Sequence, residues 1–263
     1  MRATTIELSH EEYRTAWHWL GLGTRHWNLD LPGLQALTED ENRARVANTL
    51  DCLRARGLAD RQGPVSEVED ALRLLAHPLR EINGSVHVGA ARLRLLAGAR
   101  GDLAVLAMLD GQQLVMHTGP AGELCISVAR LLPERPAGPG SSVSVPSELL
   151  ARPASGGKAG LTALQLQDRL VRGGVKLTDA QSFATMIRGP KAYGGKFGAA
   201  RRDRNGARHS AGAALIYLAT ERGGYTLQPL RGADGSAWTT LAPATLGQLA
   251  QRIDQLLDGI RAC

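Results

Sequence analysis

Apolar residues recur at helical spacing along several stretches of the chain, and five of these stretches begin with the same polar signal. The signal is a Ser or Thr followed three residues later by Glu or Gln, a capping box whose side chains bond to free backbone N–H groups at a helix start. It occurs at Ser9/Glu12, Thr38/Glu41, Ser66/Glu69, Thr162/Gln165 and Thr178/Gln181. A residue that typically ends a helix follows each stretch, at Gly21, Gly57, Pro78, Gly173 and Gly189. The pattern predicts five helices, and apolar spacing predicts two more, at residues 123–132 and from Pro243 to Ile260.

Short uncharged runs between the predicted helices have the length and composition of strands. The clearest are residues 103–109 and 213–219, which are apolar and fit central strands of a sheet. Weaker strand patterns occupy residues 92–97, 114–118, 196–202, 225–230 and 238–241. Asp110-Gly111 and Gly223-Gly224 lie where hairpins would turn, because such pairs adopt the backbone conformations that tight turns need.

The order of predicted elements repeats along the chain. Two helices, about four strands and one helix occupy residues 38–133, and the same succession occupies residues 160–261. Hairpin-linked strands without helices between them predict an α+β fold with an antiparallel sheet. We therefore expect a quasi-twofold molecule of two similar halves, residues 1–137 and 160–263, joined by a connection rich in Pro, Gly and Ser at 138–159. We expect the halves to share one sheet within one domain, although two separate domains would give the same pattern.

Composition indicates a globular protein of a reducing compartment. With 263 residues, 43% of them hydrophobic, the chain can bury a sizeable core. No stretch approaches the length of about 18 uncharged apolar residues that a membrane span needs, and the start of the chain lacks the apolar segment of an export signal. Cys52, Cys125 and Cys263 are far apart and odd in number, so a disulfide framework is not expected. These features predict a cytoplasmic protein without membrane insertion.

The net charge of +6 is unevenly distributed between the two halves. Residues 1–150 carry 15 Lys or Arg against 18 Asp or Glu, whereas residues 151–263 carry 16 against 7. The second half is therefore strongly basic, which indicates an acidic partner. A solvated basic surface without a partner explains the same charge equally well.

Several motifs typical of phosphate-binding and catalytic sites are only partly matched in this chain. Gly157-Lys158 lacks the first glycine and the following Ser or Thr of a phosphate-binding loop. Ser210 follows His209, yet Arg208 occupies the position of the first glycine in a nucleophile elbow. No histidine has a His, Cys or carboxylate neighbour at metal-ligand spacing. We predict no catalytic residue, no metal and no cofactor; an enzyme whose site is assembled from distant residues around His209 and Ser210 stays an alternative interpretation.

A basic segment, Arg188–Arg208, supports a second alternative. It contains seven Lys or Arg residues interleaved with Tyr193 and Phe197. Cations that contact phosphates, together with aromatic rings that stack on bases, are typical of single-stranded nucleic-acid binding. Asp203 and the lack of a recognised nucleic-acid module count against this interpretation.

Short motifs in matching order along nearly the whole chain carry a family resemblance. In the first half they are residues 8–13 (LSHEEY), 17–23 (WHWLGLG), 31–33 (LPG), 38–41 (TEDE) and 53–58 (LRARGL). In the second half they are residues 202–206 (RDRNG), 223–225 (GGY) and 238–243 (WTTLAP). With these motifs the chain resembles the EspG family of type VII (ESX) secretion.

The resemblance implies both a fold and a function. The implied fold is quasi-twofold α+β, with a central, largely antiparallel sheet flanked by two helical bundles. The implied function is that of a non-enzymatic cytosolic chaperone. Such a chaperone binds the helical tip of the PPE protein in a PE–PPE heterodimer, keeps the heterodimer soluble and releases it for export. The implied partner surface lies on the exposed sheet face and the C-terminal helical bundle.

We predict partner-binding residues in the basic second half. Thr226, Gln228 and Leu230 share one face of the predicted strand 225–230, which we expect to be open to a partner. On the helix after Pro243, polar residues lie off the apolar stripe and could meet the partner's helical tip: Gln248, Gln251, Arg252 and Gln255.

Overall fold

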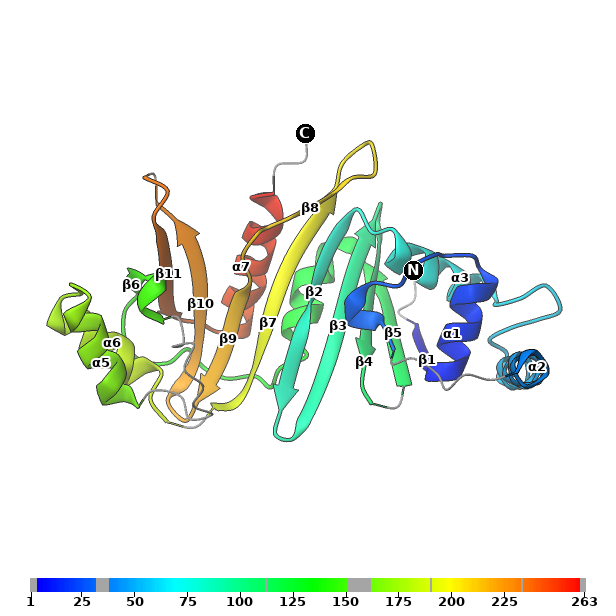
Figure 1. Ribbon diagram of the computed structural model, residues 1–263, viewed down its shortest axis with the longest axis horizontal. Helices are drawn as coiled ribbons and strands as arrows, with labels where there is room; N and C mark the ends of the chain where they lie inside the picture. Colours follow the sequence, from blue (N-terminus) through cyan, green and yellow to red (C-terminus); the bar gives the residue numbers. More distant parts are fainter. Residues whose placement is uncertain are drawn as a thin grey trace.

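The computed structural model describes residues 4–31, 38–111, 113–150, 162–189, 191–232 and 234–260, whose strands form one eleven-stranded sheet. The strands are β1 (Thr5–Ser9), β2 (Arg80–Val88), β3 (Ala91–Arg100), β4 (Leu103–Leu109), β5 (Gln113–Pro120), β6 (Val143–Pro146), β7 (Lys191–Arg202), β8 (Arg208–Ser210), β9 (Leu215–Thr220), β10 (Gly223–Arg231) and β11 (Ala237–Pro243). Their order is β1-β5-β4-β3-β2-β7-β9-β10-β11-β6, with β8 paired to β7 (Figure 1).

The pairing of β2 with β7 joins the two halves of the chain at the middle of the sheet. Five strands lie on each side of this junction in the order, and every pair of named strands is antiparallel. The quasi-twofold, largely antiparallel arrangement expected from the sequence is confirmed.

The helices gather at the two ends of the sheet and across its centre. They are α1 (His10–Trp19), α2 (Glu39–Ala55), α3 (Ser66–Ala76), α4 (Leu124–Ala129), α5 (Ala163–Arg172), α6 (Leu177–Met186) and α7 (Leu246–Asp258), with 3-10 turns η1 (Trp27–Leu29), η2 (Ala121–Glu123) and η3 (Ser147–Leu150). Figure 1 shows α1, α2 and α3 at one end and α5 and α6 at the other, so two helical bundles flank the sheet as expected. Within the described ranges, no helix has the length and apolar character needed to cross a membrane.

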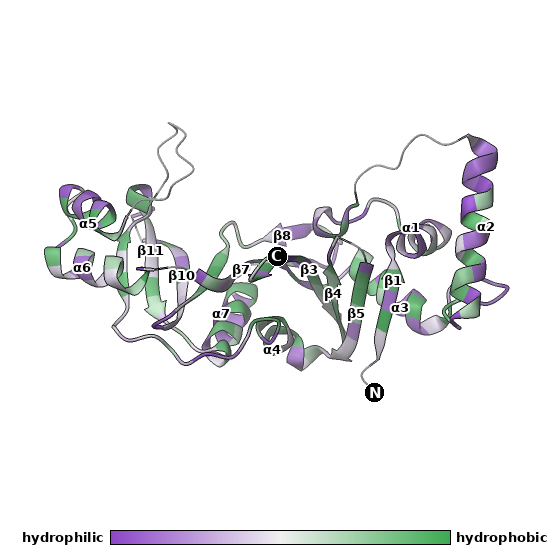
Figure 2. Cartoon of the chain, turned by 90° about the horizontal axis from the view of Figure 1, so that it is seen from below, coloured by the Kyte–Doolittle hydropathy of each residue, from purple (hydrophilic) through white to green (hydrophobic). Residues whose placement is uncertain are grey.

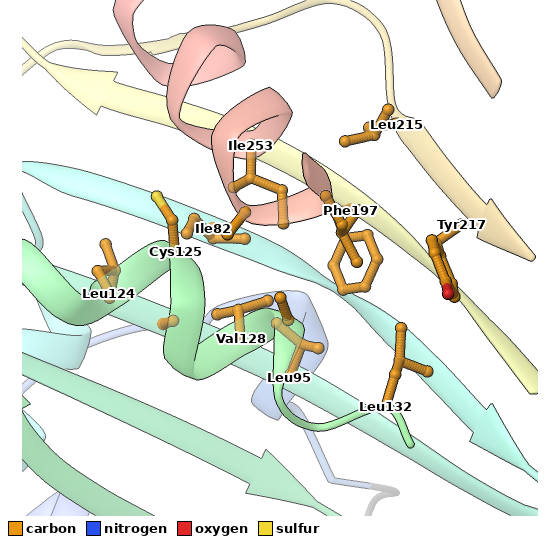
Figure 3. Packing of buried hydrophobic residues seen from close by; sticks show 14 of the residues in the cluster. Ile82, Leu95, Leu124, Cys125, Val128, Leu132, Phe197, Leu215, Tyr217 and Ile253 are labelled. Carbon is orange, nitrogen blue, oxygen red and sulfur yellow. The ribbon is translucent and has the colours of Figure 1, made fainter. Parts of the chain in front are cut away.

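One face of the sheet, the α7 face, carries α4 and α7 over its middle strands. Figure 2 shows both helices on the same side of the sheet. Leu124 and Val128 of α4 and Ile253 of α7 pack into one cluster with Ile82 of β2 and Phe197 of β7 (Figure 3). Burial of large apolar side chains is the main favourable term in folding, so this cluster fixes the two halves to each other as well as the helices to the sheet.

The opposite face, the open face, is covered only towards its ends by the described helices. Side chains of α1 and α3 pack there against β1, β3, β4 and β5, and side chains of α5 and α6 pack against β6, β10 and β11. In the middle, Lys196 of β7 is exposed and Ile216 of β9 is 37% exposed. The open face therefore offers the floor of the sheet to solvent between two helical bundles.

Local sequence signals place most helix starts correctly. Capping boxes form at Ser9/Glu12, Thr38/Glu41 and Thr162/Gln165, as predicted. The two others were wrong, because Val65 and Lys176 are the N-cap residues of α3 and α6. Ser66 is already the first helical residue, and its hydroxyl bonds to the Glu67 carboxylate instead.

Four strands were not predicted: β1, β2, β6 and β8. In β2 the polar triplet Asn83-Gly84-Ser85 hides the strand, although both of its edges are paired. β6 lies inside the segment 138–159 that was predicted to be a connection, and it pairs with β11 at the end of the sheet. The part of that segment at residues 151–159 lies outside the described residues.

Candidate partner-binding site

The three strand residues predicted to contact a partner lie on the α7 face of β10, but they differ in exposure. Leu230 is 47% exposed and Gln228 is half-buried. Thr226 has no exposed surface, and its hydroxyl donates a hydrogen bond of 3.5 Å to the Ala242 carbonyl oxygen. Thr226 is therefore not open to a partner as expected, because the first four residues of β10 are buried on both faces of the sheet.

The four predicted helix residues follow the outer side of α7. Gln251 and Gln255 are exposed, as their place off the apolar stripe requires. Arg252 is half-buried, and burial lowers the pKa of its guanidinium. Gln248 is exposed, but its side-chain oxygen accepts a hydrogen bond of 2.8 Å from the Thr245 N–H in a capping box that starts α7. The helix therefore begins at Leu246, later than the predicted first turn at Pro243.

The structure brings three of the predicted residues together in one groove, which we call the α7 groove. Gln228, Leu230 and Gln255 line this groove of about 990 Å³ between β10, β8 and the end of α7. The other four predicted residues, Thr226, Gln248, Gln251 and Arg252, do not line it.

Two arginine side chains next to α7 form ion pairs with aspartates of that helix. Arg80 of β2 forms an ion pair of 2.6 Å with Asp254, and Arg201 of β7 lies 3.9 Å from Asp258. These pairs neutralise part of the basic charge on the α7 face. The predicted acidic partner therefore finds fewer free cations here than the net charge of the second half suggests.

On the open face, basic side chains surround a hollow that sequence reasoning missed. This basic hollow, of about 550 Å³, is lined among others by Arg92 and Arg94 of β3, Ser85 of β2, Lys196 of β7 and Trp27 of η1. Trp27 is 65% exposed, which is unusual for the largest apolar side chain. The cations come from both halves of the chain, so their proximity depends on β2, one of the four strands that were not predicted.

Beside the hollow, a buried carboxylate ties the two halves together. Glu81 of β2 accepts two hydrogen bonds from Arg208, one of 2.8 Å from Asn83, and lies 3.2 Å from His26 Nε2. Burial alone would raise the pKa of Glu81, but the contacts with His26 and Arg208 outweigh burial and lower this pKa to about 2. The carboxylate stays ionised and its charge is neutralised locally.

A further hollow of the C-terminal half lies between α5, α6 and the start of β7. Its volume is about 580 Å³, and it is lined among others by Leu164, Ile187, Arg188 and Lys191. Leu164 is 66% exposed, so this end of the molecule presents apolar surface next to basic side chains.

The two alternative interpretations lose their structural motivation. Tyr193 and Phe197, the aromatic residues of the basic segment, are buried in the core and cannot stack on bases. His209 and Ser210 are consecutive residues of β8, so their side chains project to opposite faces of the sheet. His209 Nε2 instead lies 2.9 Å from the Asp203 carboxylate. In the part of the chain that the structure describes, no group of three or more His, Cys, Asp or Glu residues could hold a metal.

Comparison with known proteins gives a family match and a structural match. The sequence profile of the EspG family matches residues 9–255. The fold is similar to that of the type VII secretion system chaperone EspG5 of Mycobacterium tuberculosis, solved in complex with the PE25–PPE41 dimer. The TM-score is 0.69 and the identity 16%, over 98% of this chain and 97% of that chain. No curated protein sequence matches the chain.

Proposed function

The chain belongs to the EspG family, and from this membership we propose that it is a cytoplasmic, non-enzymatic chaperone for type VII secretion. Its client is a PE–PPE heterodimer, which it binds through the helical tip of the PPE subunit, keeps soluble and releases for export. The observation that carries the proposal is the similarity over 98% of the chain to EspG5, a chaperone solved with a PE–PPE dimer bound.

We propose the open face, with the adjoining α5–α6 bundle, as the client surface. Between the bundles the floor of the sheet is exposed at Lys196 and Ile216, and the bundle adds the exposed side chain of Leu164. Interfaces of this kind combine an apolar centre with a polar rim, and they bury roughly 1,200–2,000 Å² in total. The open face offers both kinds of surface side by side.

The α7 groove is the alternative client surface. It contains Gln228, Leu230 and Gln255 of the residues predicted from the sequence, and exposed Gln251 lies on the same helix. Against it stand the ion pairs of Arg80 and Arg201, which neutralise two of the cations next to α7. Variants on the two faces discriminate between the surfaces.

Co-expression tests the proposed function directly. Each PE–PPE pair encoded in the same genome is expressed with and without the chain, and soluble heterodimer is measured by affinity capture through a tag on the chain. We expect at least one pair to become soluble and to elute with the chain as a complex in size-exclusion chromatography. If every pair is equally soluble without the chain and none is captured, the chain is not a PE–PPE chaperone.

A further inference from the structure

We propose that the basic hollow of the open face is an anchor for a carboxylate side chain at the tip of the PPE client. The proposal deepens the proposed function and rests on it. It assigns Arg92, Arg94 and Lys196 as residues that select an acidic client and fix its position on the sheet.

Strand register places the three cations on the same face of the sheet. Ser85 of β2 pairs with Arg94 on one side and with Lys196 on the other, so these two side chains flank Ser85 in one row across three strands. Arg92 lies in the next row, paired with His87. Directly paired residues have Cβ atoms about 4.5–5.5 Å apart, so side chains as long as Arg and Lys can reach one anion from both sides.

None of the three cations has an ion-pair partner among the described residues. Glu81, the nearby buried carboxylate, is occupied by Arg208 and His26. One acidic residue, Asp110, also lines the hollow, and its carboxylate accepts a hydrogen bond of 2.8 Å from the Gln113 N–H. With three basic residues against one acidic residue, the lining keeps a net positive charge.

The surroundings favour a carboxylate on a helical tip over a small free anion. The hollow of about 550 Å³ has room for a whole side chain and part of a helix turn. Trp27 at its border presents an exposed indole ring, which can pack on the apolar part of such a turn. Gly198, another lining residue, keeps the floor low, because a Cβ there would lie 2.8 Å from Asn83 Oδ1.

Charge reversal in the hollow tests the anchor. The variants are Lys196→Glu and Arg92→Glu, singly and together, because both residues are exposed and need not perturb folding. The matched control is Arg130→Glu, an equal change of charge at an exposed residue that follows α4 on the α7 face. The probe is the PE–PPE pair that the unaltered chain captures on co-expression, and the measurement is the Kd by calorimetry, with circular dichroism to check the fold.

We expect each reversal to weaken client binding about tenfold and the double variant to weaken it further, since like charge then faces the client's carboxylate. Arg130→Glu, at a residue outside the hollow, should keep the affinity within about twofold. The affinity of the unaltered chain should fall between about 50 and 500 mM NaCl, and the double variant should lose most of this salt dependence.

Unchanged affinity of the double variant, with client capture by the unaltered chain intact, would overturn the anchor and leave the chaperone function standing. Failure of the unaltered chain to capture any pair would overturn both. A third outcome would also overturn the anchor: the unaltered chain binds single-stranded DNA at low salt, and Lys196→Glu abolishes this binding while client affinity stays unchanged. The hollow would then be assigned to nucleic acid.

Discussion

Glu81 and Arg208 form a bidentate ion pair across the middle of the sheet, with contacts of 2.6 Å from Nη2 to Oε1 and 3.1 Å from Nε to Oε2. The side chain of Glu81 is 4% exposed and that of Arg208 is 34% exposed. The pair connects β2 of the first half to β8 of the second half beyond the backbone pairing of β2 and β7.

Removing the charge of Glu81 should destabilise the fold. In Glu81→Gln the amide cannot accept the two charged hydrogen bonds, and Arg208 and His26 lose their shared anion. We expect the free energy of unfolding to fall by roughly 2–4 kcal/mol, at the lower end because Arg208 can be hydrated. Urea denaturation measures the change. A double-mutant cycle with Arg208→Ala should show coupling, and additive effects of the two substitutions would contradict the paired role.

The same pair predicts sensitivity to acid. The pKa of Glu81 is about 2 in the folded protein against an ordinary value of 4.5, so the folded state binds its proton more weakly than the unfolded state does. The ion pair therefore contributes its stability in full above pH 4.5, and this contribution is lost as the pH falls from 4.5 through 2. The denaturation midpoint should drop over this range, and it should drop less in Glu81→Gln. If the denaturation midpoints of the two proteins fell in parallel with pH, Glu81 would not be the source of the acid sensitivity.

Gly84 should be irreplaceable at the junction of the halves. A Cβ at this position would overlap the backbone oxygen of Lys196 in the paired strand β7. Gly84→Ala must therefore push β2 and β7 apart, and we expect a loss of at least about 2–3 kcal/mol, as for other strained core substitutions. The control is Gly119→Ala in β5, where no atom lies within 4 Å of the added Cβ. Equal stability of the two variants in thermal denaturation would contradict this account of the junction.

Variants in the α7 groove decide between the two client surfaces. We expect the double variant Gln228→Glu, Gln255→Glu to keep its client affinity within about twofold, because both residues line the α7 groove and not the open face that we propose as the client surface. Arg252→Glu should behave alike. A tenfold loss of client affinity in either variant, with an unchanged circular dichroism spectrum, would show that the client contacts the residues predicted from the sequence and not the open face. Thr226 is unsuitable for this test, since a charge at that fully buried position would destabilise β10.

Helices and their order were predictable because their signals are local. The capping boxes at Ser9, Thr38 and Thr162 need only residues within one turn, and the structure has all three. The same signal at Thr245/Gln248 marks the start of α7, but the helix was predicted to begin at Pro243. Proline at that point ends β11 instead of beginning the helix.

The candidate site was less predictable, because exposure depends on what covers each face. Alternation along β10 separates Thr226 from Tyr225 correctly, yet no local pattern says that both faces are covered there. The basic hollow requires Arg94 and Lys196 to be neighbours across β2, a strand whose polar centre gave no strand signal. Residues that meet only through an unrecognised strand cannot be grouped from the sequence.

The junction of β2 and β7 also affects the risk of aggregation during translation. About 100 residues separate Val88 at the end of β2 from Lys191 at the start of β7. At typical translation rates of about 5–20 residues per second, β2 stays an unpaired edge on the ribosome for roughly 5–20 s. An apolar edge of that length would invite association between nascent chains. The polar sequence Asn83-Gly84-Ser85, because of which β2 was not predicted as a strand, gives the centre of this unpaired edge low hydrophobicity and low β-propensity. Both properties reduce association of the edge with other chains until β7 has been synthesised.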